Sequence, residues 1–148
     1  PLLVDRGAPL SGQGTDGTAS FMAALRQSID PADLRWIFLT HADMDHVGSI
    51  HQVLQEAPKA RVITTFLTAG RMSVYRPLPM DRVYLLNPGQ SLDLGDRTIT
   101  VVKPPTYDAA DTTGFFDAKS KTFFSADSFG ALLAQFMTEV KRSSGASA

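Results

Sequence analysis

An apolar run leads into a cluster of histidines and aspartates in the stretch Trp36-Ile-Phe-Leu-Thr-His-Ala-Asp-Met-Asp-His-Val-Gly-Ser49. Residues 36–39 are short, apolar and aromatic, which predicts a buried strand. Four side chains that commonly bind metals follow this strand: His41, Asp43, Asp45 and His46. Alternation beyond the strand places the first two on one side, and the last two fall where we expect a helix to begin, near Val47. Open α/β sheets carry their sites at the carboxyl ends of strands, so the four groups are expected to converge there.

Imidazoles and carboxylates together form the ligand set of zinc, iron and manganese sites. The alternative interpretation is a polar helix N-terminus in which Asp45 caps the helix. Capping accounts for one acidic residue, but not for two histidines and two aspartates within residues 41–46. The spacing therefore favours metal binding.

Composition narrows the class of protein. The chain has 148 residues, 43% of them hydrophobic, which is enough for one domain with its own core. The net charge of −1, without a basic cluster, argues against nucleic acid or an anionic membrane surface as partner. No apolar run approaches the length of a membrane span. The absence of cysteine excludes disulfides and thiolate metal sites and fits a cytoplasmic location. We expect a small-molecule substrate, and the sequence leaves the oligomeric state open.

Strand-like and helix-like segments alternate along the first half of the chain, and hairpins follow. This order predicts a mixed-sheet α/β layer architecture. Periodicity and turn signals place strands over 2–5, 36–40, 61–65, 83–86, 98–102, 114–117 and 122–125. Helices are expected over 19–29, 47–56, 69–75 and 129–140, with a short turn starting at Asp30-Pro31.

Three further features carry less weight. Gly12-Gln-Gly-Thr-Asp-Gly17 matches the dinucleotide pattern G-x-G-x-x-G, but it does not follow a strand directly, so we interpret it as a surface loop. Ser125-Ala-Asp-Ser128 lacks the surroundings of a nucleophilic serine. His51 lies about 140° around the predicted helix from His46, so we expect it to pack or to be solvated rather than to bind metal.

The His/Asp stretch resembles the signature loop of the metallo-β-lactamase fold. Thr40-His-x-Asp-x-Asp-His-x-Gly-Ser49 is similar to the usual His-x-His-x-Asp-His form, with Asp43 in place of the second histidine. A carboxylate there resembles the flavodiiron proteins and the related oxygen-sensing diiron proteins. Leu3-Val-Asp-Arg-Gly7 is similar to the family's early strand and turn. Lys121-Thr-Phe-Phe-Ser-Ala-Asp-Ser-Phe-Gly130 is similar to a later strand that ends in a metal-bridging aspartate, here Asp127.

The resemblance implies a metallo-β-lactamase-like αββα sandwich with mixed sheets. The family's fold is usually longer than this chain, so we expect an incomplete version of it. On this interpretation, residues 1–140 form a partial domain and residues 141–148 a flexible tail.

The resemblance also implies a site for two divalent metal ions. Its ligands would be His41, Asp43, Asp45, His46 and Asp127. This oxygen-rich set favours iron or manganese, with zinc possible. The family uses a further histidine before the bridging aspartate, and Tyr107 stands in its place, with Asp108 and Asp111 as alternative carboxylates. Another histidine near the carboxyl end has no counterpart, so we expect weak, partial metal occupancy.

Three functions follow from these expectations. The function that we expect first, from the breadth of the superfamily, is a hydrolase of esters, thioesters or phosphodiesters, in which two metal ions activate a water that Asp45 orients; the other two functions are alternatives. The carboxylate at residue 43 favours instead a diiron redox or oxygen-sensing domain. The missing histidines favour a non-catalytic domain with a degenerate metal site.

Overall fold

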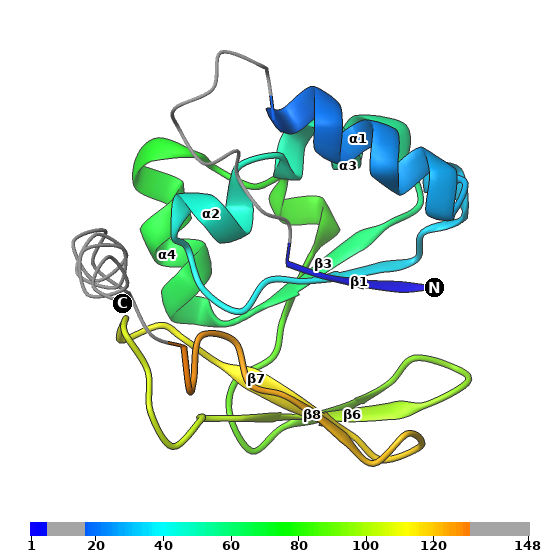
Figure 1. Cartoon of the computed structure of the whole chain (residues 1–148). Coiled ribbons are helices and arrows are strands. Elements are labelled where there is room, and N and C mark those ends of the chain that lie inside the picture. The colour runs from blue at the N-terminus through cyan, green and yellow to red at the C-terminus, as the bar shows by residue number, and fades with distance from the viewer. Residues whose placement is uncertain (6–16, 131–148) are drawn as a thin grey trace, which may run out of the picture.

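The residues that the structure describes form a framework of two four-stranded sheets (Figure 1). The computed structural model describes residues 1–5 and 17–130. The Gly-rich loop, apart from Gly17, lies outside the described residues, as do residues 131–140 of the helix expected over 129–140 and the expected tail.

The first sheet is parallel and has the order β1-β2-β3-β4. Its strands are β1 (Leu2–Val4), β2 (Trp36–Phe38), β3 (Arg61–Thr64) and β4 (Val83–Leu85). Parallel neighbours need crossover connections, and helices provide them here. These are α1 (Gly17–Ser28), α2 (Met44–Val47), α3 (Ile50–Glu56) and α4 (Phe66–Tyr75), with the 3-10 turns η1 (Pro31–Asp33) and η2 (Met80–Arg82). The four carboxyl ends therefore lie at one edge of the sheet.

The second sheet is antiparallel and has the order β5-β6-β7-β8. Its strands are β5 (Ser91–Asp93), β6 (Thr98–Val102), β7 (Gly114–Asp117) and β8 (Thr122–Phe124). The expected hairpin between β7 and β8 is confirmed, with Phe116 opposite Phe123. Strand β5 was not predicted, because Leu92 is its one apolar residue.

The strands of the first sheet divide the core into two layers. In β2, Ile37 packs among the helices, whereas Phe38 points between the sheets. There the ring of Phe115 lies 4.6 Å from that of Phe38 and 4.5 Å from that of Phe124, centroid to centroid. Among the described residues, helices cover the outer face of the first sheet, and none covers that of the second (Figure 1).

The helix after β2 begins earlier than the sequence indicated. Asp43 has extended backbone angles and occupies the N-cap position, so α2 starts at Met44 rather than near Val47. The helix stops at Gly48 and resumes as α3 at Ile50. Asp45 and His46 consequently lie within the first helical turn and not before it.

The described helices include none that is long and apolar enough to cross a membrane.

Candidate metal centre

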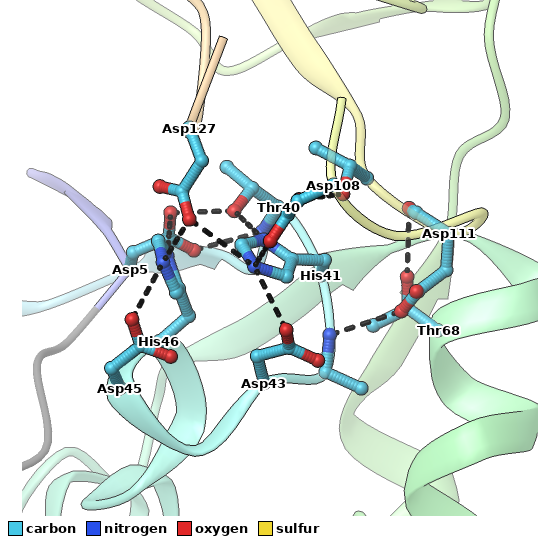
Figure 2. Close-up of polar contacts among 12 residues, drawn as sticks. Asp5, Thr40, His41, Asp43, Asp45, His46, Thr68, Asp108, Asp111 and Asp127 are labelled. Carbon is cyan, nitrogen blue, oxygen red and sulfur yellow. Dashed lines mark hydrogen bonds and ion pairs between the residues drawn. The ribbon is translucent and has the colours of Figure 1, made fainter. Parts of the chain in front are cut away.

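The loop after β2 is fixed by carboxylates from other parts of the chain (Figure 2). Asp5, directly after β1, accepts hydrogen bonds from Thr40 N (2.8 Å) and Thr40 Oγ1 (2.6 Å). Asp111, between β6 and β7, accepts one from Ala42 N (3.0 Å). The carbonyl of Thr40 in turn accepts from Thr113 N at 2.9 Å. The loop is thus bound to the strand beside it and to the opposite sheet.

His41 is the most buried member of the site. Its side chain is 1% exposed, and its Nε2 has no hydrogen-bond partner among the described residues. The Thr40 hydroxyl gives its proton to Asp5, so its oxygen accepts from His41 Nδ1, 3.0 Å away. That assignment places the hydrogen of a neutral His41 on Nδ1 and leaves the Nε2 lone pair directed into the site. A buried lone pair that accepts no hydrogen bond would be stabilised by a bound cation.

Three carboxylate oxygens surround this nitrogen. They belong to Asp43 (3.8 Å), Asp108 (3.8 Å) and Asp127 (3.7 Å). Lone pairs and negative oxygens repel one another unless a proton or a metal ion lies between them. This arrangement suits a metal ion, and the described residues provide nitrogen and oxygen donors for it.

Asp43 reaches His41 because an arginine holds its other oxygen. Arg71 on α4 donates to Asp43 Oδ1 at 3.0 Å and also pairs with Asp111. Asp43 makes no side-chain capping bond, so Oδ2 remains directed to His41. Sequence reasoning missed Arg71, because a single arginine on a helix carries no signal of its tertiary partners.

His46 is oriented by Asp5. Asp5 Oδ2 lies 3.1 Å from His46 Nδ1, which leaves Nε2 toward Asp127 Oδ2, 3.2 Å away. A carboxylate behind an imidazole is the usual support of a metal-binding histidine. The rings of His41 and His46 lie 3.9 Å apart, centroid to centroid. Asp5 was not predicted to have this role, although its position at a strand's carboxyl end is a signal that sequence reasoning could have used.

Asp127 lies between the two histidines, as a bridging ligand would. One of its oxygens, Oδ2, is 3.2 Å from His46 Nε2 and 3.7 Å from His41 Nε2. Ala126 before it has φ 53, a left-handed conformation that is uncommon for a residue with a Cβ. This backbone turn after β8 directs Asp127 back over the first sheet. Its bridging role stays a prediction.

The remaining predicted site residue, Asp45, is placed less centrally. Its Oδ2 lies 3.5 Å from His46 Nε2, but its side chain is 65% exposed. The two groups whose ligand atoms lie within 4.8 Å of one another are His41, His46 and Asp127, and His41, Asp43 and Asp108. Asp45 and His51 belong to neither group among the described residues.

Asp108, and not Tyr107, faces the site from the loop in which the missing histidine was expected. Tyr107 is 54% exposed, and its ring centroid lies 3.8 Å from Lys103 Nζ, so of the alternatives left open by the sequence it is Asp108 that approaches His41. The reason is local, since the loop between β6 and β7 turns the next residue inward. Partial burial would raise the pKa of Asp108, but the hydrogen bond from Thr112 and those from the backbone lower it below its usual value.

The carboxylates change the protonation of His46. Burial alone would lower its pKa, but the hydrogen bond and charge of Asp5 raise it, with help from the charges of Asp127 and Asp45, to about 9. Without metal, His46 is therefore positively charged near neutral pH and offsets part of the negative charge. A metal ion must displace that proton in order to bind Nε2.

Known proteins with related sequences include redox flavoproteins. The chain is 28% identical over 106 residues to an uncharacterized protein of Methanocaldococcus jannaschii, covering 72% of this chain and 27% of that protein. It is 29% identical over 114 residues to a putative diflavin flavoprotein of Thermosynechococcus vestitus (75% and 19%). It is 26% identical over 111 residues to the anaerobic nitric oxide reductase flavorubredoxin of Klebsiella pneumoniae (74% and 23%). The chain thus spans about a quarter or less of the length of these relatives.

Solved structures share the fold. The flavodiiron protein of Giardia intestinalis superposes with a TM-score of 0.75 at 17% identity, covering 97% of this chain and 34% of that one. Rubredoxin:oxygen oxidoreductase of Desulfovibrio gigas superposes with a TM-score of 0.74 at 21% identity, covering 90% of this chain and 32% of that one. A mutant metallo-β-lactamase of Cronobacter sakazakii gives 0.63 at 21% identity (82% and 49%). The expected metallo-β-lactamase fold is therefore confirmed.

A family model also matches most of the chain, including the loops that carry the site. The model is described as ODP family beta lactamase, and it matches residues 5–145. The chain therefore belongs to the ODP family of β-lactamase-like proteins.

Proposed function

We propose that this chain is a dinuclear metal domain of the flavodiiron type, which carries out redox or sensing chemistry on a small molecule such as dioxygen or nitric oxide. One observation carries the proposal: the buried, unpartnered Nε2 of His41 faces carboxylates rather than hydrogen-bond donors. Such oxygen-rich surroundings favour iron or manganese over zinc. Iron and manganese exchange electrons, whereas zinc does not.

Different residues of the described site would bind each of the two ions. His41 and Asp43 would bind the first, His46 would bind the second, and Asp127 lies within reach of both. Asp5 keeps Nε2 of His46 directed inward, and Arg71 keeps the free oxygen of Asp43 directed to His41. A pair of such ions would supply redox chemistry to a bound small molecule.

The site is open enough for such a molecule. Asp43, Asp45 and Asp127 are each at least one-third exposed, whereas His41 is buried behind them. Similarity to a nitric oxide reductase and to diflavin flavoproteins supports the redox alternative over the hydrolase that the breadth of the superfamily favoured. Reduction requires an electron donor, and by the same analogy we propose a flavoprotein in that role.

The test is anaerobic loading of the full chain with Fe²⁺, followed by exposure to dioxygen or nitric oxide. We expect an absorption band from ferric or nitrosyl iron that forms with the wild type and not with Asp127→Asn. His51→Gln is the matched control and should retain the band, because His51 belongs to neither ligand group.

Two outcomes would contradict the proposal. Zinc-dependent phosphodiester hydrolysis, with no spectral response of the iron form, would favour the hydrolase. Failure to bind iron, manganese or zinc would leave a domain with a degenerate site.

A further inference from the structure

Asp108 approaches the site from the second sheet, in the loop between β6 and β7. Its Oδ1 accepts a hydrogen bond from Thr112 Oγ1 at 3.0 Å, which fixes the carboxylate. Its Oδ2 lies 3.8 Å from His41 Nε2. One oxygen is therefore anchored and the other is directed to the unpartnered nitrogen (Figure 2).

The neighbouring acidic residue has a different task. The side chain of Asp111 is fully buried, with Oδ1 paired to Arg71 and Oδ2 accepting from Ala42 N. Both of its oxygens are thus engaged in holding the loop. Asp108 is 48% exposed, and its Oδ2 lies 3.8 Å from His41 Nε2. Of the two carboxylates in this loop, Asp108 is the one that can bind an ion.

The distances around His41 match a shared metal ion. Ligands ~2.0–2.2 Å from a tetrahedral metal are roughly 3.3–3.6 Å from one another. The separations from His41 Nε2 to Asp43, Asp108 and Asp127 are 3.7–3.8 Å. A contraction of a few tenths of an ångström would bring the oxygens of Asp43 and Asp108 to this spacing from His41 Nε2. The ligand atoms of His41, Asp43 and Asp108 already lie within 4.8 Å of one another.

We propose that Asp108 is a ligand of the metal ion beside His41, and that its carboxylate determines which metal this position prefers. His41, Asp43 and Asp108 then give this position one nitrogen and two carboxylate oxygens, a set suited to manganese and iron. An imidazole at residue 108 would give two nitrogens and shift the preference toward zinc. The inference rests on the proposed function, because it concerns the same centre.

The experiment compares Mn²⁺ and Zn²⁺ binding to the full chain by calorimetric titration. Asp108→Asn keeps the size of the side chain and an oxygen that accepts from Thr112, but it removes the charge. We expect it to weaken Mn²⁺ binding by about 10–100-fold at one of two positions. Asp108→His should raise the ratio of Zn²⁺ to Mn²⁺ affinity by at least about tenfold.

Asp81→Asn is the matched control, an exposed aspartate in η2 at the amino end of β4, on the opposite edge of the sheet from the site. Thermal melts of the metal-free variants check that each is folded. Wild-type binding that stays within about twofold in Asp108→Asn, as in the control, would overturn the role of Asp108 and leave the metal centre intact. A wild type that binds neither ion would overturn both this inference and the proposed function.

Discussion

Metal binding by this centre should strengthen by about tenfold for each pH unit between pH 7 and the pKa of His46, which is about 9. The proton on His46 occupies the nitrogen that a metal needs, and Asp5 stabilises the protonated form from the other side of the ring. At pH 7, two units below that pKa, roughly 1% of the metal-free protein has a neutral His46. The apparent affinity is reduced by the same factor.

The assay is a competition titration of Mn²⁺ against a fluorescent chelator at several pH values from about 6.5 to 8. Calorimetry in two buffers with different ionisation enthalpies counts the protons released at each pH. We expect about one proton from His46 per protein at pH 7, and a slope of about one in the logarithm of affinity against pH.

Two variants test the assignment. His46→Gln removes the titrating group and should flatten the slope, whereas His51→Gln should preserve it. Proton release near zero at pH 7, or an unchanged slope in His46→Gln, would refute the reasoning.

Stability and packing give three further expectations. In metal-free protein, the raised pKa of His46 adds up to about 3 kcal/mol to the free energy of unfolding. This stability is fully present below the ordinary pKa of 6.5 and is lost as pH rises through about 9. Urea unfolding should therefore give a lower unfolding free energy at the higher pH, and a flat profile would contradict this. Arg71→Gln leaves the buried Asp111 without its cation and should lower the unfolding free energy by about 3 kcal/mol; a loss below about 1 kcal/mol would mean that Asp111 is satisfied without it. Gly114→Ala places a Cβ against the carbonyl oxygen of Phe124, so β8 must move; we expect a loss of about 1–3 kcal/mol in melts and weaker Mn²⁺ binding, since Asp127 follows that strand.

Local sequence patterns predicted most of the fold. Strands β2, β3, β6 and β8 lie within or at their predicted ranges because each is a short apolar or alternating run with clear boundaries. The helix start at Met44 could not be predicted, because it depends on the extended backbone of Asp43 at the end of a loop that Asp5 and Asp111 hold.

The candidate site was predictable where it is local in sequence. His41, Asp43 and His46 fall within a few residues of one another, so their spacing carries the information. Arg71 acts across 28 residues on Asp43, and no periodicity encodes that pairing. The choice between Tyr107 and Asp108 depends on how a long loop turns, which neighbouring residue types do not determine.

The site draws its donors from both halves of the sandwich. His41 and His46 follow a strand of the first sheet, whereas Asp108 and Asp127 come from loops of the second (Figure 2). A metal ion held by both groups would act as a cross-link at one end of the two layers, and at a free concentration 100 times the dissociation constant it would add roughly 2.7 kcal/mol to the unfolding free energy. The stability of the contact between the two sheets at this edge, and with it the protein's resistance to proteolysis, would then rise and fall with the free metal concentration.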